Sequence, residues 1–402
     1  MRQHRDYQIF IRIKQFMKIA IDQVVGTISP RPTSHKAGWS WLWANQLKYY
    51  FAQLGEGDVE IKVLHNEESW DGYDLIYLDH GMEFNGESLN LFGGAQDEPA
   101  LRLGRLLSVD PLSLVSLDRA MPDYGALGKG RLKACSNVWR NTDWDAITAA
   151  CGKMDFMTQE SMAEHIKLDH LALGDSHTFS MYKPGMAVCR NDGQTMFGAL
   201  KRGLKSFIEP FGPQIKKLTL YFGNIDIRHH LMRQPDPAAA LFAMLDEYEK
   251  QIKALNMDYV ELISALPIEN ESRKLPKTGF YKGTPFAGTW EERTALVTIF
   301  NMRLEEICHC NGWEFYSHPN VYKNEKGELD FEVMEKPQSV HLARLYYRWD
   351  LENDCPNPNL LARPSKDKPK KEKVPKILIP RIKNVEPVPL LDQLNGKPLI
   401  EF

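Results

Sequence analysis

Short apolar runs alternate with longer stretches in which apolar residues recur at helical spacing along most of the 402-residue chain. A short apolar run bounded by turn residues predicts a strand buried on both faces, and the helical spacing predicts an amphipathic helix. Their regular alternation predicts parallel sheets of the α/β class. In the first part of the chain, the expected strands are residues 17–22, 59–65, 73–79 and 112–118, and the expected helices are 38–54 and 98–107.

A second series of the same kind begins near residue 165. Its expected strands are residues 170–173, 186–189, 217–222, 258–263 and 314–317, and its helices include 237–255 and 290–310. Domains have ~150 residues on average, so a chain of this length predicts two or three of them. We expect a basic extension over 1–16, a small Rossmann-like α/β domain over 17–160, a second α/β domain over 161–362, and a Pro/Lys-rich linker with a docking motif over 363–402.

The composition is that of a folded protein without a membrane segment. Hydrophobic residues make up 43% of the chain, which is enough to bury sizeable cores. No apolar run approaches the ~20 residues that a transmembrane helix needs. Residues 9–13 form an apolar stretch that is too short and too interrupted for a signal peptide. We therefore expect a soluble protein of the cytoplasm.

The net charge of −3 is unevenly distributed along the chain. Residues 363–402 hold 10 Lys/Arg against 5 Asp/Glu, and residues 1–18 hold 5 against 1, which leaves residues 19–362 at −12. A surface that binds duplex DNA normally carries a basic excess, so the acidic body argues against a nucleic-acid binder. Contact with nucleic acid stays open for the basic tail, and the apolar residues of 390–402 predict a docking motif for a protein partner.

The cysteines and glycines predict neither a metal nor a cofactor. The six cysteines show no C-x-x-C pair, and Cys308-His309-Cys310 lacks a second ligand pair at a usual spacing. Neither a G-x-G-x-x-G motif nor a Walker loop is present. Reduced and mostly buried thiols are the expectation.

The strongest chemical signal is the apolar run at 171–173 that ends in Gly174-Asp175-Ser176-His177. This arrangement puts a hydroxyl on the turn that leaves a buried strand, where a serine nucleophile is useful. The alternative is that Asp175 or Ser176 caps a helix, since both residue types are favoured there. A serine hydroxyl needs a base within hydrogen-bond reach, and histidine is the usual one.

Two later blocks favour the nucleophile over the cap. Gly223-Asn224-Ile225-Asp226 follows an expected strand, and Ser339-Val340-His341-Leu342 lies late in the chain. In this order the three blocks resemble the SGNH (GDSL-like) hydrolase superfamily over residues 165–350. The resemblance implies a three-layer α/β/α fold with a parallel sheet, and an esterase or acyltransferase that acts on an acylated sugar-like or small-molecule ester.

The resemblance also implies roles for single residues. Ser176 is the expected nucleophile and His341 the expected base, with the pair His229 and His230 as the alternative base. The oxyanion is expected to lie against the serine N–H, the Asn224 amide and a glycine N–H. For that glycine we favour Gly193, with Gly185 and Gly198 as alternatives.

The acid of the expected triad departs from the family pattern. The family places an aspartate three residues before its histidine, and this chain has Gln338 there, with Glu335 and Asp330 as the nearest carboxylates. A Ser–His dyad oriented by a backbone carbonyl is one possibility, and a carboxylate from elsewhere is another.

We expect Asp175, His177, Asp226 and Arg228 to bind substrate around this site. Arg228 would clamp an anionic or carbonyl group. The alternative for Arg228 is a surface or interdomain ion pair with Asp226.

A glycine-rich stretch at residues 79–94 follows the third expected strand, where α/β sheets bind ligands. Together with residues 73–74 and Pro122, it faintly resembles the amino-terminal halves of phage DNA glucosyltransferases. This resemblance implies a second hypothesis, a nucleic-acid or sugar modification transferase that binds a nucleotide sugar. The alternative for the stretch is a plain turn that needs glycine. A third hypothesis is a degenerate, non-catalytic SGNH binding module.

Overall fold

The computed structural model describes residues 16–22, 35–55, 58–64, 69–78, 105–117, 143–273, 286–335 and 339–353. These residues divide into two compact units, and the chain passes from the first to the second between residues 162 and 163. Each unit is built around its own five-stranded sheet.

The sheet of the first unit is parallel throughout and has the order β2-β1-β3-β4-β5. Four strands match the expected apolar runs, whereas β5 was not expected. The strands are β1 (Phe16–Asp22), β2 (Asp58–Leu64), β3 (Leu75–Leu78), β4 (Leu114–Leu117) and β5 (Asp155–Met157). The helices are α1 (His35–Gln53), α5 (Trp144–Cys151) and α6 (Gln159–His165). Of the helix expected over 98–107, the structure describes a 3-10 turn at Arg105–Ser108.

The sheet of the second unit is also parallel and has the order β10-β9-β8-β6-β7. All five expected strands are present, and each end lies within one residue of the expected position. They are β6 (His170–Gly174), β7 (Met186–Arg190), β8 (Lys217–Tyr221), β9 (Tyr259–Ile263) and β10 (Glu314–Tyr316). The helices are α7 (Met196–Arg202), α8 (Lys205–Ile208), α9 (Pro237–Leu255), α10 (Trp290–Asn311) and α11 (Arg348–Glu352).

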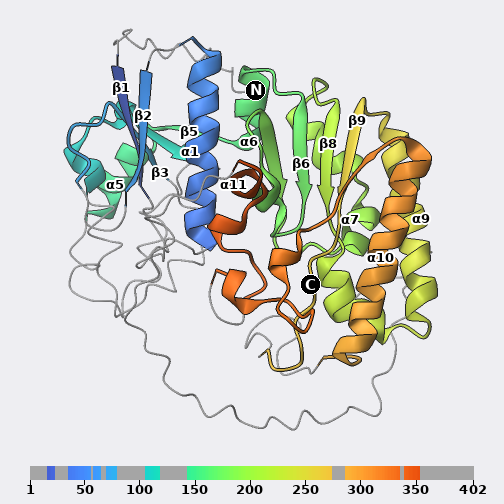
Figure 1. Ribbon diagram of the computed structural model, residues 1–402. Coiled ribbons are helices and arrows are strands. Elements are labelled where there is room, and N and C mark those ends of the chain that lie inside the picture. Colours follow the sequence, from blue (N-terminus) through green and yellow to red (C-terminus); the bar gives the residue numbers. More distant parts are fainter. Residues whose placement is uncertain are drawn as a thin grey trace, which may run out of the picture. The chain divides into compact units, whose positions relative to one another are not determined.

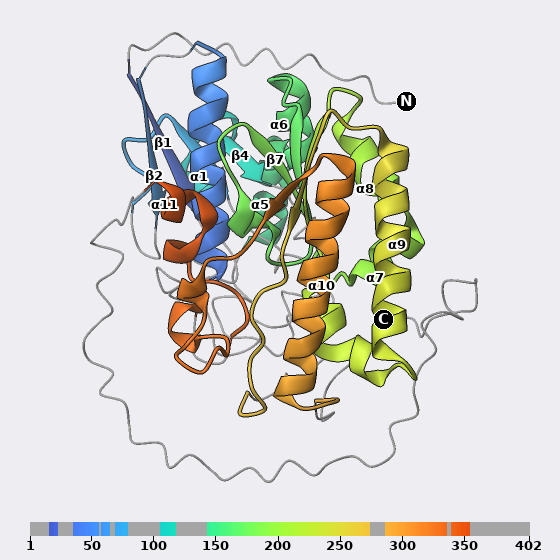
Figure 2. The same cartoon turned by 45° about the vertical axis from the view of Figure 1, so that its right-hand side comes forward.

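Helices cover this second sheet on one face, and shorter elements lie on the other. Connections between parallel strands are right-handed, which puts the crossovers through α7, α9 and α10 on a common face. Figures 1 and 2 show α9 and α10 side by side along this sheet. The β6–β7 connection runs the opposite way, and α11 contacts its 3-10 turn at Thr178–Met181. The result is the layered α/β architecture that the sequence predicts.

The two long helices of this unit begin at strong sequence signals. Pro237 opens α9, and the Asp236 carboxylate accepts the backbone N–H of Ala239. Thr289 and Glu292 form a reciprocal capping box at the start of α10. These caps explain why the boundaries of both helices match the sequence so closely.

A buried ion pair anchors the last described segment to the second sheet. Arg348 of α11 donates to both carboxylate oxygens of Glu261 in β9, at 2.8 and 2.7 Å. Glu261 also accepts the Thr219 hydroxyl of β8 at 2.9 Å. Because both charged groups are buried and bidentate, they hold residues 339–353 against the sheet.

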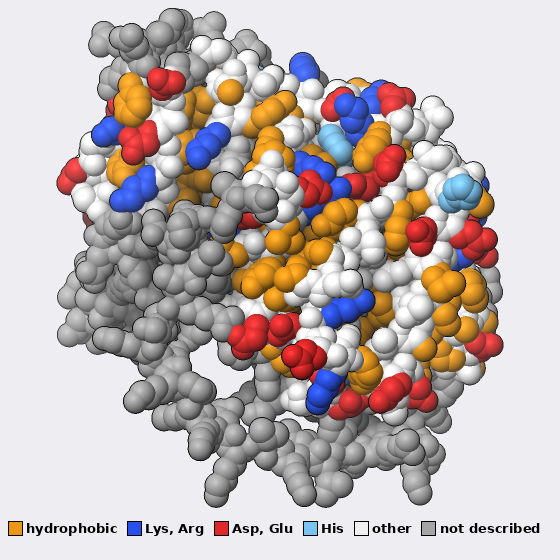
Figure 3. All heavy atoms as spheres, in the orientation of Figure 1, with side chains coloured by type: hydrophobic (Ala, Val, Ile, Leu, Met, Phe, Trp, Pro, Cys, Tyr) orange, Lys and Arg blue, Asp and Glu red, His pale blue; other side chains and the backbone are white. Residues whose placement is uncertain are grey.

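Several expected features lie outside the described residues. They are residues 1–15 of the extension expected over 1–16, the glycine-rich stretch at 79–94, Gln338, and the tail and docking motif over 363–402. Within the described part of the chain, no helix is long and apolar enough to cross a membrane. The described surface in the view of Figure 3 carries Lys/Arg and Asp/Glu side chains interspersed with one another.

Candidate active site

The turn after β6 carries the serine. Gly174 is the last residue of β6, and the N–H of Asp175 donates to the Tyr221 carbonyl of β8 at 3.1 Å. A Cβ at Gly174 would collide with that same carbonyl oxygen and with the Thr178 hydroxyl. Only glycine lets the two strands approach this closely, and the next residues turn out of the sheet at once. Ser176 is left 8% exposed at the carboxyl edge.

His341 reaches this serine from a segment 165 residues further along the chain. The Ser176 Oγ and the His341 Nε2 lie 2.9 Å apart, which is a full hydrogen bond. The structure therefore brings together the two residues on which the proposed chemistry depends most.

Glu335 supplies a carboxylate on the other side of the His341 ring. Its Oε1 lies 3.4 Å from His341 Nδ1, at the long end of the hydrogen-bond range. The Ser339 hydroxyl donates to the same Oε1 at 2.7 Å and accepts the His341 backbone N–H at 3.1 Å. Serine, histidine and glutamate thus stand in the order of a nucleophile, a base and an orienting acid.

A local backbone pairing explains why an acid six residues before the histidine can reach it. Met334 and Leu342 form an antiparallel bridge, and the N–H of Glu335 donates to the His341 carbonyl at 2.9 Å. This pairing sets residues 335 and 341 side by side, so the two side chains meet. Sequence reasoning named Glu335 only as a nearby carboxylate, because the family spacing points to residue 338.

The surroundings of His341 favour its neutral form. Burial lowers the pKa of the imidazole, and the hydrogen bond with Glu335 opposes this only in part. A neutral ring with its proton on Nδ1, toward Glu335, leaves the Nε2 lone pair free to accept the Ser176 hydroxyl. That is the state in which a histidine acts as a base.

Asn224 lies at the carboxyl end of β8 and is buried beside the serine turn. Its Oδ1 accepts the N–H of Leu266 at 2.9 Å, which fixes the amide plane. Its Nδ2 lies 3.4 Å from Asp175 Oδ2. The amide therefore lies against the residue that directly precedes Ser176.

The positions of the three candidate glycines relative to the sheet distinguish them as possible oxyanion donors. Gly185 precedes β7 and so lies at the amino edge, opposite the serine turn. The N–H of Gly198 donates to the Thr195 hydroxyl in the cap of α7. Gly193 follows β7 at the carboxyl edge with a φ of +71°, beyond Asn191, whose N–H donates to Gly174 O at 3.0 Å. Gly193 therefore remains the best candidate of the three.

Asp226 and Arg228 are buried inside the second unit rather than lining a substrate mouth. Asp226 accepts the backbone N–H groups of Met196 and Phe197 at the start of α7, at 2.7 and 3.2 Å. Burial raises the pKa of its carboxyl to about 6, against these hydrogen bonds. Arg228 bonds to Glu269 at 2.9 Å, so the structure differs both from the expected substrate clamp and from the alternative pair with Asp226.

Asp175 and His177 are likewise buried and bonded to each other instead of facing substrate. The His177 Nδ1 lies 2.9 Å from Asp175 Oδ1, and its Nε2 lies 2.8 Å from the Val340 carbonyl. Burial raises the pKa of Asp175, but His177 and the hydrogen bonds from His177 and Asn224 outweigh it, so the pKa is lowered overall. A contact of these two residues with substrate stays a prediction.

The alternative bases, His229 and His230, have other surroundings. The His229 ring is stacked on Phe286 with an interplanar angle of 9°, and burial lowers its pKa to about 3. Burial lowers the pKa of His230 to about 4. The Ser176 hydroxyl is instead bonded to the Nε2 of His341.

No group of described His, Cys, Asp and Glu residues could hold a metal ion. Cys308 is buried and its thiol donates to the Glu314 carbonyl at 3.2 Å, whereas Cys310 is exposed.

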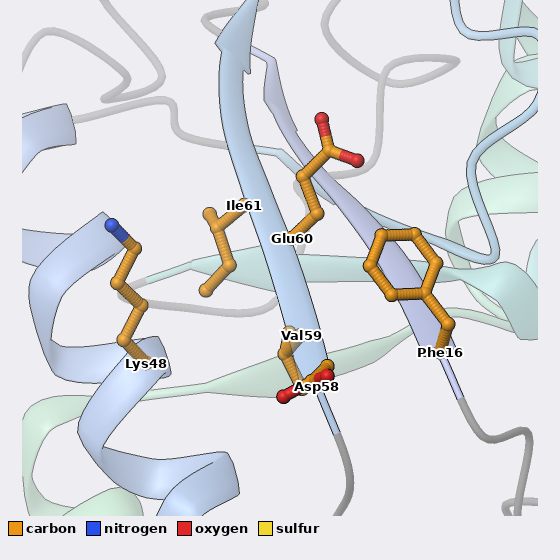
Figure 4. Close-up of a pocket in the computed structure, with 6 residues that line it drawn as sticks. All are labelled: Phe16, Lys48, Asp58, Val59, Glu60 and Ile61. Carbon is orange, nitrogen blue, oxygen red and sulfur yellow. The ribbon is translucent and has the colours of Figure 1, made fainter.

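In the first unit, a surface hollow runs along the edge strand β2 (Figure 4). It is lined by Phe16, Lys48, Asp58, Val59, Glu60 and Ile61.

No family model matches the sequence, and no curated protein matches it. Solved structures with a similar fold include a GDSL-like lipase from Bacteroides thetaiotaomicron, 14% identical over 47% of this chain and 90% of that chain, with a TM-score of 0.33. A provisionally described acylhydrolase from Bacteroides fragilis is 16% identical over 48% and 87%, with a TM-score of 0.32. A diltiazem-metabolizing enzyme of a gut microbe is 16% identical over 38% and 37%, with a TM-score of 0.28.

These likenesses cover 38–48% of this chain. The assignment of chemistry below therefore rests on the residues of the second unit. The expected resemblance of the first unit to phage DNA glucosyltransferases stays a prediction.

Proposed function

We propose that the second unit is a serine esterase or acyltransferase of the SGNH type. The observation that carries the proposal is the 2.9 Å hydrogen bond between Ser176 Oγ and His341 Nε2, with Glu335 on the far side of the same ring. The three groups together fit nucleophilic catalysis.

In the proposed reaction, the His341 Nε2 takes the Ser176 proton while Oγ attacks the ester carbonyl carbon. The carbonyl oxygen becomes an oxyanion, and the Asn224 amide with the Ser176 and Gly193 N–H groups would stabilise it. When the intermediate collapses, the C–O bond to the alcohol breaks, and His341 returns the proton to that leaving oxygen. Water then attacks the acyl-serine with His341 again as base, or a second alcohol does so in a transferase.

The substrate we propose is an acyl ester of a sugar-like or other small-molecule alcohol. This class follows from the resemblance rather than from Arg228, whose bond to Glu269 does not support an anion clamp. A panel of acetylated sugars and simple aryl esters, each tested with water and with added alcohols, would separate hydrolysis from transfer.

A fluorophosphonate probe and p-nitrophenyl acetate test the proposal directly. We expect the wild-type protein to be labelled and to release p-nitrophenol, and Ser176→Ala to do neither. Ser206→Ala is a matched control, because that hydroxyl only bonds to the Gly203 carbonyl within a turn. An unlabelled wild type, or equal labelling of Ser176→Ala, would refute the proposal and favour a non-catalytic binding module.

A further inference from the structure

His177 lies between the two halves of the proposed site and belongs to neither catalytic role. It follows the proposed nucleophile directly, and its side chain turns away from Ser176 toward the loop of His341. On one side it contacts Asp175, and on the other it contacts Val340, the residue just before His341. Its side chain is almost completely buried, so water does not compete for these bonds.

Both atoms that face the His177 ring are hydrogen-bond acceptors. Asp175 is a carboxylate that also accepts the His177 backbone N–H at 2.9 Å, and the Val340 oxygen is a backbone carbonyl. A neutral imidazole has a single N–H, so one of its nitrogens would direct a lone pair at an oxygen. Only an imidazolium satisfies both contacts, and a buried polar group without a partner is costly.

We propose that His177 is a doubly protonated positioning residue that ties the serine turn to the loop of the catalytic base. This inference rests on the proposed function, since it assigns to His177 a task in the same reaction. This brace consists of two bonds of the His177 ring, one of 2.9 Å to Asp175 and one of 2.8 Å to Val340, which lies 163 positions after His177. Through Val340, it sets how far His341 stands from Ser176.

The brace also acts on the charge of the base. The His177 and His341 rings have centroids 4.9 Å apart, and two like charges at that distance repel. Burial is the largest cause that lowers the pKa of His341, and the positive charges of His177 and Arg190 lower it further. His341 is therefore kept neutral under mildly acidic conditions in which a free histidine would be protonated.

The other groups around His177 leave this arrangement intact. Tyr221 packs edge-on to the His177 ring at 5.9 Å, and its hydroxyl bonds to His318 at 2.8 Å. Burial lowers the pKa of His318 to about 3, so that ring is neutral. Asp175 is then the one carboxylate bonded to His177 within the described residues, and Glu335 faces His341 from the far side.

The first test measures protonation and needs no turnover. In Ser176→Ala labelled with 15N in its histidine rings, we expect one histidine at pH 7.5 to carry protons on both nitrogens. We expect His341 to be neutral with its proton on Nδ1. A spectrum of His177→Gln identifies the signal by its loss. If the His177 ring of the Ser176→Ala protein carried a single proton, the proposal would be overturned, whatever the activity of the protein.

The second test uses the kinetics of His177→Gln with p-nitrophenyl acetate. Misplacement of about 1 Å at a reacting group can cost about 100-fold, so we expect kcat to fall ten- to a hundred-fold with KM little changed. We also expect the acid limb of the kcat/KM profile to move to higher pH, since His341 loses its charged neighbour. A purely structural role would leave that limb in place.

His170→Gln is the matched control for both tests. His170 begins β6 at the opposite edge of the sheet, where it bonds to Thr219 at 3.0 Å. We expect its kcat and its acid limb to match the wild type. If His177→Gln also matched the wild type in both, the brace would be refuted. If the wild type showed no hydrolysis while the imidazolium was present, the proposed function would fail instead.

Discussion

Replacing Glu335 by glutamine tests the proposed acid while changing the shape of the side chain very little. In the ground state His341 is neutral, so the carboxylate matters most when the imidazolium forms in the transition state. Unit charges 3.4 Å apart interact by about 5 kcal/mol at an effective dielectric constant of about 20, which is an upper limit. The glutamine oxygen can still accept the Nδ1 proton, and a charged acceptor exceeds a neutral one by about 1–2 kcal/mol.

These two limits place the lost transition-state stabilisation between about 1 and 5 kcal/mol, or about five- to several-thousand-fold in kcat/KM. The loss should appear in kcat, with KM unchanged, for hydrolysis of p-nitrophenyl acetate at pH 7.5. Asp330→Asn is the control, because that carboxylate only caps a turn by accepting the Glu332 N–H and asparagine caps equally well. We expect its activity to stay within about twofold of the wild type. A folded Glu335→Gln within about twofold of the wild type would show that Glu335 is not the orienting acid.

Three further outcomes are expected for stability. Gly174→Ala should lower the free energy of unfolding in urea by at least about 1–3 kcal/mol, because its Cβ meets the backbone of β8, whereas Gly152→Ala, whose Cβ has only ordinary contacts at 3.5 and 3.7 Å, should not. Arg348→Met should cost about 3–5 kcal/mol by leaving Glu261 buried and unpaired, and a second substitution, Glu261→Leu, should restore part of the loss. Burial lowers the pKa of His318 to about 3, so the unfolded chain binds a proton that the folded state does not, and the free energy of unfolding should fall as the pH falls from about 6.5. His318→Gln should show a shallower fall in urea titrations at a series of pH values, and an unchanged slope would contradict the assignment.

Most strands of both sheets could be predicted because each is an apolar run buried on both faces. The strand β5 could not, since residues 155–157 are largely exposed and carry no such run. The 3-10 turns at Phe331–Val333 and Arg344–Tyr346 could not be predicted either, because the spacing of apolar residues does not mark such short elements. Apolar patterning reports burial, and it is silent about short elements held by backbone hydrogen bonds.

In the candidate site, too, residues marked by a local pattern could be predicted, whereas contacts between distant residues could not. Ser176, Asn224 and His341 follow strands or fall at family spacings, so their order along the chain was informative. The role of Glu335 depends on the bridge between residues 334 and 342, which no local pattern announces. The sequence shows the charge of Arg228 next to the Gly-Asn-x-Asp block. Its partner Glu269 lies 41 residues later, after β9, so the ion pair could not be predicted from the local sequence.

The ion pair between Arg348 and Glu261 has a consequence for how this protein could be divided. The sheet through β9 carries Ser176 and Asn224, while the base, the acid and their anchor all belong to residues 335–348. A fragment that ends before Glu335 would keep the serine but lack every group that activates it. Adding the missing segment as a separate peptide would restore the site through the Arg348 anchor. In such a split protein, we expect ester hydrolysis to report the binding of the separate peptide to the fragment.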